Sequence, residues 1–212
     1  MDKKVEYKKI IKKTWHFIWE DNSIWSWLVN IILAFVLIKF IVYPGLGFLL
    51  NTTHPVVAVV SRSMEHNYVG FDKWWELNKN WYLENGITKE NFTGFPFRNG
   101  FNKGDIFVLK GKTCQDVRIG EIIVFRSARP DPIIHRSINK WIENGYCYIQ
   151  TKGDNNADSI RAQSLDETKI REDQLVGKAL WRIPYLGYIK IGFVCAIYGV
   201  QGKDSFFECL MR

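Results

Sequence analysis

The sequence predicts a mainly β protein: an antiparallel β-sheet domain that follows one membrane-spanning helix and carries a small helical insert. Two observations lead to this fold class. From residue 104 onward, short apolar runs alternate with turn residues and no helices separate them, which favours an antiparallel sheet. Near the amino end, residues 24–50 are apolar except for Asn30 and Lys39, which is typical of a helix in a membrane.

The expected strands are short apolar runs bounded by turn signals. They lie at residues 56–60, 105–109, 119–125, 133–142, 146–151 and 174–183. Asn144 and Gly145 separate two of these runs, and this dipeptide favours a two-residue β-hairpin turn. Consecutive strands joined by tight turns pair with their neighbours, so we expect one antiparallel sheet.

Residues 24–50 are long enough to cross a membrane, because about 20 apolar residues span a hydrocarbon core of about 30 Å. Two alternatives are a buried core helix and a cleaved targeting sequence. The segment is long for a core helix, and it exceeds the apolar stretch of about 7–15 residues that is usual in a signal sequence. Pro44, Gly45 and Gly47 are expected to kink or end the helix. We therefore predict a spanning helix that leads directly into the β domain.

The charges around this span predict its orientation. Six lysines precede it, at positions 3, 4, 8, 9, 12 and 13. By the positive-inside rule, residues 1–23 form a basic cytoplasmic tail and residues 51–190 form an extracytoplasmic domain. The prediction is a single-pass protein of the cell membrane that contacts the lipid bilayer. The same lysines hold most of the excess in the formal net charge of +7, so no nucleic-acid partner is expected.

Two segments keep more than one interpretation. In the insert, residues 68–103, aromatic residues recur at about helical spacing after Asp72, a candidate N-cap, and a second short helix is expected from Thr88. The tryptophans of the insert either pack on the domain or dip into the membrane interface. Residues 185–200 favour contact with the interface over a second crossing, and residues 191–212 form a membrane-proximal segment without a motif.

The four cysteines show no CxxC pair or zinc-ligand spacing, so neither a metal nor a cofactor is expected. In one interpretation Cys114 and Cys147 form a disulfide on the extracytoplasmic side of the membrane. Separate buried thiols are the favoured interpretation, since cysteine is often buried without a bond.

A serine, a histidine and two aspartates stand at the edges of apolar runs. Ser63 follows the first expected strand, His135 lies in a later one, and Asp154 and Asp158 follow the run that ends at residue 151. A serine becomes a useful nucleophile when a base takes its proton, and a carboxylate can hold that base in the required tautomer. Such a trio also arises by chance in a chain of this length, so spacing alone does not establish a catalytic site.

Six motifs in order add to this pattern: SRSMEHN, KGDIFVLKG, IGEIIVF, IIHRSI, TKGDNN and RIPYLGYI. They cover roughly residues 56–190 and resemble the conserved boxes of type I signal peptidases. Within that family they are similar to the archaeal and endoplasmic-reticulum branch, which has a histidine where the bacterial branch has a catalytic lysine. The resemblance implies a coiled β-sheet domain.

The resemblance also assigns roles to residues. It implies that Ser63 is the nucleophile, His135 the general base, and either Asp158 or Asp154 the carboxylate that orients the base, with Asp158 slightly favoured. The backbone N–H of Ser63 and the hydroxyl of Ser61 are expected to stabilise the oxyanion. Met64 either lines the pocket for the small side chain before the cleaved bond or fills the core.

The motif around Ser63 departs from the family pattern at two positions. Arg62 stands where a glycine is usual, so the backbone there is expected to avoid a positive φ. His66 replaces a proline and is a rival base for Ser63. A histidine three residues beyond the nucleophile is poorly placed to reach back to the hydroxyl, which leaves His135 favoured.

The resemblance implies a membrane-anchored serine endopeptidase that removes signal peptides from exported preproteins after small residues, at sites of the Ala-X-Ala type. Its partners would be these preproteins, the lipid bilayer and the protein translocation machinery. The alternative from a different class is a non-catalytic, membrane-tethered β-module that binds exported proteins.

Overall fold

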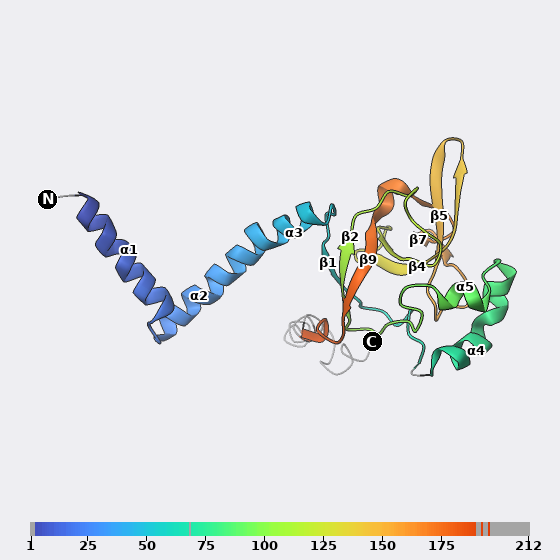
Figure 1. Cartoon of the computed structure of the whole chain (residues 1–212), viewed down its shortest axis with the longest axis horizontal. Helices are drawn as coiled ribbons and strands as arrows, with labels where there is room; N and C mark the ends of the chain where they lie inside the picture. The colour runs from blue at the N-terminus through green and yellow to red at the C-terminus, as the bar shows by residue number, and fades with distance from the viewer. Residues whose placement is uncertain (1–2, 68, 190–191, 193–194, 196–212) are drawn as a thin grey trace. The chain divides into compact units, whose positions relative to one another are not determined.

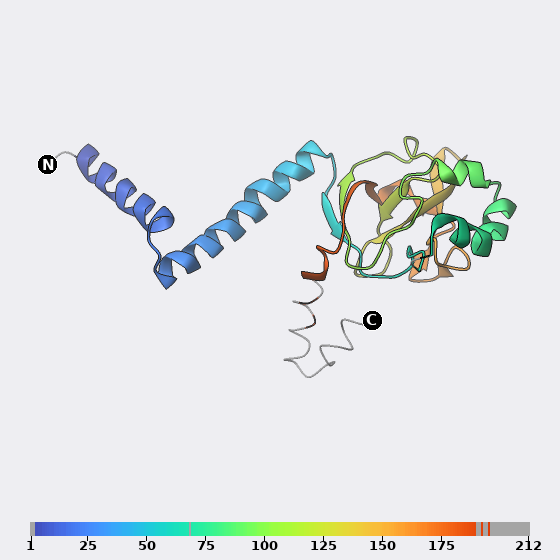
Figure 2. The same ribbon diagram turned by 60° about the horizontal axis from the view of Figure 1, so that its bottom comes forward.

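The structure, a computed structural model, describes residues 3–67, 69–189, 192 and 195 (Figures 1 and 2). The chain divides into two compact units between Leu49 and Leu50. The first contains only helices, and the second contains all the strands. Most of the predicted membrane-proximal segment at residues 191–212, and most of the apolar run at 185–200, lie outside the described residues.

The first unit begins with α1 (Lys3–Trp19), a helix that was not expected in the basic tail. A continuous helical segment follows, made of α2 (Ile24–Leu37), the π-helical turn η1 (Ile38–Val42) and α3 (Tyr43–Leu49). The π turn lies directly before Pro44, which has no backbone N–H to donate to the preceding turn. The wider π turn accommodates this missing donor, and the helix continues past Pro44 to end at Leu49.

Ile24–Leu49 is long and apolar enough to cross a membrane, and none of its most apolar stretch is buried. The start of the helix is capped by Ser23, whose hydroxyl accepts from the N–H of Ser26.

The second unit is built on a seven-stranded sheet with the order β1-β2-β9-β3-β4-β5-β8, in which all neighbouring strands are antiparallel. The strands are β1 (Val56–Ala58), β2 (Ile106–Lys110), β3 (Ile122–Phe125), β4 (Ile133–Glu143), β5 (Tyr146–Lys152), β8 (Ile170–Arg171) and β9 (Leu175–Ile183). Figure 1 shows the sheet curling on itself. The mainly β, antiparallel fold class is thereby confirmed.

The long hairpin of β4 and β5 turns where the sequence predicts. Asn144 and Gly145 have φ values of 52° and 80°, as a type I′ turn requires. The segment after β5 contains three short strands that the sequence analysis missed. β6 (Arg161–Ala162) and β7 (Leu165–Asp166) pair as a small separate sheet, and β8 pairs with β5. A short 3-10 turn, Glu172–Gln174, joins β8 to β9.

The insert folds as α4 (Phe71–Glu84) and α5 (Lys89–Thr93), which lie at the end of the β domain away from β1 (Figures 1 and 2). Gly70 rather than Asp72 occupies the N-cap of α4, whereas Thr88 caps α5 as expected. The two helices bury a cluster of aromatic side chains: Trp74, Trp75, Tyr82 and Phe92. The packing interpretation is thus correct for both buried tryptophans.

Cys114 and Cys147 form a disulfide, with their Cα atoms 6.0 Å apart. The favoured interpretation of separate thiols is wrong for this pair. Their sequence separation of 33 residues concealed the contact, because the loop that carries Cys114 lies against the β4–β5 hairpin only in the folded domain.

Candidate active site

Ser63 lies on the turn that follows β1, and main-chain hydrogen bonds hold this turn on two sides. The carbonyl oxygen of Ser63 accepts from the N–H of Asn155 at 2.8 Å, and that of Met64 accepts from the N–H of Phe101 at 3.0 Å. The Ser63 hydroxyl oxygen lies 3.0 Å from the hydroxyl oxygen of Ser61. The serine is therefore partly buried on a turn whose backbone is fixed by distant parts of the chain.

His135 meets Ser63 from β4, where it is paired with Ile123 of β3. Its Nε2 lies 2.7 Å from Ser63 Oγ, and its side chain is almost entirely buried. Gly153 packs beneath this contact: a Cβ there would lie 2.8 Å from the Ser63 carbonyl oxygen and 2.9 Å from His135 Nε2. Only a residue without a side chain fits at position 153.

The carboxylate that contacts His135 belongs to Glu167, which directly follows β7. Glu167 Oε1 bonds His135 Nδ1 and accepts the hydroxyl of Thr151 at 2.9 Å, while Oε2 accepts the N–H of Ile160 at 2.9 Å. A carboxylate has no hydrogen to donate, so His135 carries its proton on Nδ1. The Nε2 lone pair is then free to accept from Ser63.

Neither predicted aspartate contacts His135. Asp154 is fully buried, and both of its oxygens are bound by Arg136, from Nε at 2.8 Å and from Nη2 at 2.6 Å. His135 and Arg136 are neighbours on β4, so their side chains point to opposite faces of the strand. The expectation that Asp154 orients His135 fails for this reason.

Asp158 is exposed, and it accepts the indole N–H of Trp81 at 2.9 Å. It thus ties the GDN loop to α4 rather than to His135. No local motif marks Glu167, because Asp154, Asp158, Asp166 and Glu167 are all acids within one short stretch. The signal that singles out Glu167 is its buried contact with His135 Nδ1, which appears only in the folded chain.

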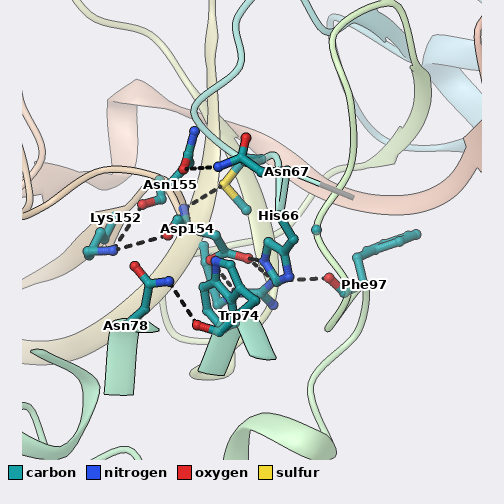
Figure 3. Close-up of polar contacts among 12 residues, drawn as sticks. His66, Asn67, Trp74, Asn78, Phe97, Lys152, Asp154 and Asn155 are labelled. Carbon is teal, nitrogen blue, oxygen red and sulfur yellow. Dashed lines mark hydrogen bonds and ion pairs between the residues drawn. The ribbon is translucent and has the colours of Figure 1, made fainter. Parts of the chain in front are cut away.

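Burial and charge shift the pKa values of groups beside the site. Burial raises the pKa of the Asp154 carboxyl, but the charge and hydrogen bonds of Arg136, followed by His66, outweigh it and hold that pKa well below its usual range. Burial raises the pKa of Tyr82, whose hydroxyl donates to Asp154. Burial lowers the pKa of Lys152 to about 8, although nearby carboxylates oppose the shift. Figure 3 shows Asp154 beside His66, which stacks on Trp74, and Lys152 directed at the backbone of the GDN loop.

A pocket of about 420 Å³ opens beside Ser63 and His135. Its apolar lining includes Ala58, Val60, Pro130, Pro132, Ile133, Ile134, Ile160 and Leu165. Met64 is not among its lining residues: the side chain is 1% exposed, packs in the core, and accepts the N–H of Asp154 through its sulfur. Met64 therefore does not line this pocket, and its position fits the alternative expectation that it fills the core.

No family model matches the chain. Curated proteins with similar sequences are named as catalytic subunits of the signal peptidase complex, SEC11, from fungi. The subunit of Yarrowia lipolytica is 28% identical over 183 residues, which cover 80% of this chain and 84% of that protein. Those of Pyricularia oryzae and Sclerotinia sclerotiorum are each 26% identical, over 72% and 76% of this chain and 71% and 77% of the respective relatives.

The chain is a homologue of these catalytic subunits. They are type I signal peptidases of the endoplasmic-reticulum type, so the suspected branch of the family is confirmed. The motifs that suggested this homology contribute Ser63, His135 and Gly153 to the site, whereas Glu167 lies beyond the TKGDNN motif.

Proposed function

We propose that the chain is a membrane-anchored serine endopeptidase that removes N-terminal signal peptides from exported preproteins. The observation that carries this proposal is the hydrogen-bonded series of Ser63, His135 and Glu167, which meets at the mouth of an apolar pocket. The homology to catalytic subunits of signal peptidase supports the same activity. The proposal replaces the two aspartates with Glu167 as the third member of the triad.

In the proposed reaction, Ser63 Oγ attacks the carbonyl carbon of the cleaved bond while His135 Nε2 takes the hydroxyl proton. His135 then returns this proton to the leaving amine, which departs as the new amino terminus of the mature protein. His135 then takes a proton from a water molecule, which attacks the ester carbon. The ester C–O bond breaks, His135 returns the proton to Ser63 Oγ, and the signal peptide leaves with a free carboxyl group. Glu167 keeps the imidazole in the Nδ1–H tautomer and stabilises its charged form in both steps.

The negative oxygen of the tetrahedral intermediate needs hydrogen-bond donors about 2.7–3.1 Å away. We propose the Ser63 backbone N–H and the Ser61 hydroxyl for this role. The distance of 3.0 Å between the hydroxyl oxygens of Ser61 and Ser63 supports it, because a carbonyl carbon bonded to Ser63 brings its own oxygen near the same donor.

The apolar pocket beside Ser63 is proposed to hold the small side chains that precede the cleaved bond in sites of the Ala-X-Ala type. Ala58 and Val60 come from the chain just before the nucleophile, and Ile133 comes from the start of β4. The lining is mainly apolar, with Arg129 and Asp131 as its charged members, so uncharged side chains are favoured where the apolar residues lie.

We also propose that residues 51–190 lie on the non-cytoplasmic face of the membrane. The lysines before Ile24–Leu49 favour a cytoplasmic amino end, and the Cys114–Cys147 disulfide fits an oxidising compartment. At about 3.5 Å per residue, the segment 51–63 reaches at most about 45 Å from the end of the span. The serine would then meet peptide bonds that emerge near the bilayer, where the proposal also places contact with the translocation machinery.

The test is cleavage of a preprotein with an Ala-X-Ala site by the full chain in detergent micelles. We expect cleavage at that site, and its loss in Ser63→Ala with an unchanged melting temperature. Ser164→Ala, which removes an exposed hydroxyl from the β6–β7 turn, is the matched control and should retain full activity. Binding of the preprotein without cleavage, by the unaltered chain, would support the non-catalytic module instead.

A further inference from the structure

His66 is a buried histidine that the proposed reaction does not use. It lies three residues after Ser63 on the same turn and is 5% exposed. Its Nε2 lies 3.1 Å from Asp154 Oδ2, and its ring stacks on the indole of Trp74 with 3.8 Å between the centroids and 3° between the planes (Figure 3). Gly100 also approaches closely, since a Cβ there would lie 2.5 Å from His66 Cδ2. The insert therefore confines the ring through both Trp74 and Gly100.

The partner of His66 is joined to the nucleophile through the backbone. Asn155, the residue after Asp154, donates its N–H to the Ser63 carbonyl oxygen at 2.8 Å and its side-chain amide to the Arg62 carbonyl oxygen at 3.2 Å. The Asp154 N–H itself donates to the sulfur of Met64 at 3.3 Å. The turn that carries Ser63 is thus bound to the GDN loop at three successive residues, and His66 adds a side-chain link just beyond them.

We propose that His66 is a positioning residue for Ser63, through which α4 of the insert braces the turn that carries the nucleophile. This inference rests on the proposed function. His66 bonds Asp154 and stacks on Trp74, so it does not act as a rival base for Ser63. Where the family pattern has a proline, this chain has a histidine whose ring packs on Trp74 of α4.

Replacing His66 leaves the main supports of Asp154 in place. The carboxylate keeps both bonds from Arg136 and the bond from the Tyr82 hydroxyl at 3.2 Å. The domain is therefore expected to fold without the imidazole. What changes is the freedom of the Ser63 turn, which loses its contact with Trp74.

The expected effect is on the rate and not on substrate binding. A displacement of about 1 Å at a reacting atom lowers the rate by up to about 10²-fold. For His66→Ala we expect kcat to fall about 10–100-fold. KM is expected to stay within about twofold, because His66 is not among the residues that line the pocket. His66→Phe keeps a flat ring on Trp74 and should recover part of the lost kcat.

Trp74 and Trp75 offer a matched pair of variants on α4. Both indoles are buried in the same aromatic cluster, with 2% and 3% exposed, but the stacking contact with His66 belongs to Trp74. If the insert only stabilises the fold, Trp74→Leu and Trp75→Leu both lower the melting temperature, and kcat of each folded variant stays equal to that of wild type. The proposal expects a lower kcat for Trp74→Leu, with little further loss when His66→Ala is added to it.

The experiment measures two reactions of the full chain in detergent micelles: preprotein cleavage, and labelling of Ser63 by a fluorophosphonate probe. In labelling, the Ser63 Oγ–P bond forms, the P–F bond breaks with loss of fluoride, and His135 takes the hydroxyl proton. The second rate depends on the placement of Ser63 and His135 but not on a peptide substrate. It separates the positioning role from the proposed function.

We expect both rates to fall together in His66→Ala and Trp74→Leu, and to stay near the wild-type values in Trp75→Leu. Slower labelling in these two variants, together with a wild-type chain that cleaves no preprotein, would support the positioning role and contradict the proposed function. Equal labelling rates in folded wild type and His66→Ala would overturn the positioning role. A wild-type chain that neither cleaves the preprotein nor is labelled at Ser63 would overturn both.

Discussion

Glu167→Gln is the substitution that most directly tests the site, because it keeps the shape of the side chain and changes only its hydrogen bonding. Glu167 Oε1 accepts from His135 and Thr151, and Oε2 accepts the backbone N–H of Ile160. In glutamine one of these two positions becomes an NH₂ group. The N–H of Ile160 is fixed by the chain, so the amide oxygen is expected to face it and the NH₂ group to face His135 Nδ1.

This orientation changes the tautomer of the base. A donor beside Nδ1 requires Nδ1 to accept, which moves the imidazole proton to Nε2. Nε2 then has no lone pair for the Ser63 hydroxyl. In a Ser-His-Asp triad the equivalent Asp→Asn change lowers kcat about 10⁴-fold, or about 5 kcal/mol in activation free energy. We expect a decrease of about 10³- to 10⁴-fold for Glu167→Gln with little change in KM.

The assay is steady-state cleavage of one preprotein by four folded proteins: wild type, Glu167→Gln, Asp158→Asn and Asp154→Asn. Asp158→Asn is the matched control, and it should keep near-normal kcat because Asp158 bonds Trp81 instead of His135. Asp154→Asn weakens a buried ion pair with Arg136, so its main effect should be a loss of stability, about 3–5 kcal/mol if the pair is broken outright. The reasoning is refuted if Glu167→Gln stays within tenfold of wild type while Asp158→Asn is inactive and folded.

Three further predictions follow from the domain. Gly153→Ala should lower kcat about 10–100-fold in a folded protein, because the new Cβ lies within 3 Å of both Ser63 and His135. Gly70→Ala, at a position with open space around it, is the control. Full activity of Gly153→Ala would contradict the close packing at position 153. Replacing both Cys114 and Cys147 with serine removes a cross-link between residues 33 positions apart in the sequence. The free energy of unfolding, measured by urea titration, should fall by about 3–4 kcal/mol. An unchanged free energy of unfolding would argue against the disulfide. Lys152 has a pKa of about 8 in the folded chain against 10.5 for an unperturbed lysine, so between these pH values the unfolded state binds more protons. The free energy of unfolding of wild type minus that of Lys152→Met should therefore rise by about 3 kcal/mol from pH 7 to pH 10.5, and a flat difference would show that Lys152 is not desolvated.

Local pattern was sufficient to predict the fold class. The run of apolar residues at 24–50 and the turn signals at Asn144 and Gly145 depend on near neighbours, and the spanning candidate and the hairpin both lie where they were expected. Short elements were missed for the opposite reason. β6 and β7 contain two residues each, too few for any periodicity, and they exist because they pair with each other.

The sequence by itself determined that Ser63 and His135 are the candidate nucleophile and base, because each lies within a motif that resembles a conserved box of type I signal peptidases. Only the tertiary structure decided which carboxylate meets His135. Arg136 points to the opposite face of β4 and forms an ion pair with Asp154, and Trp81 of the insert donates a hydrogen bond to Asp158. The β6–β7 pair places Glu167 next to His135 Nδ1. These choices depend on strand register and on contacts between segments far apart in the chain, and no local spacing of acidic residues encodes them.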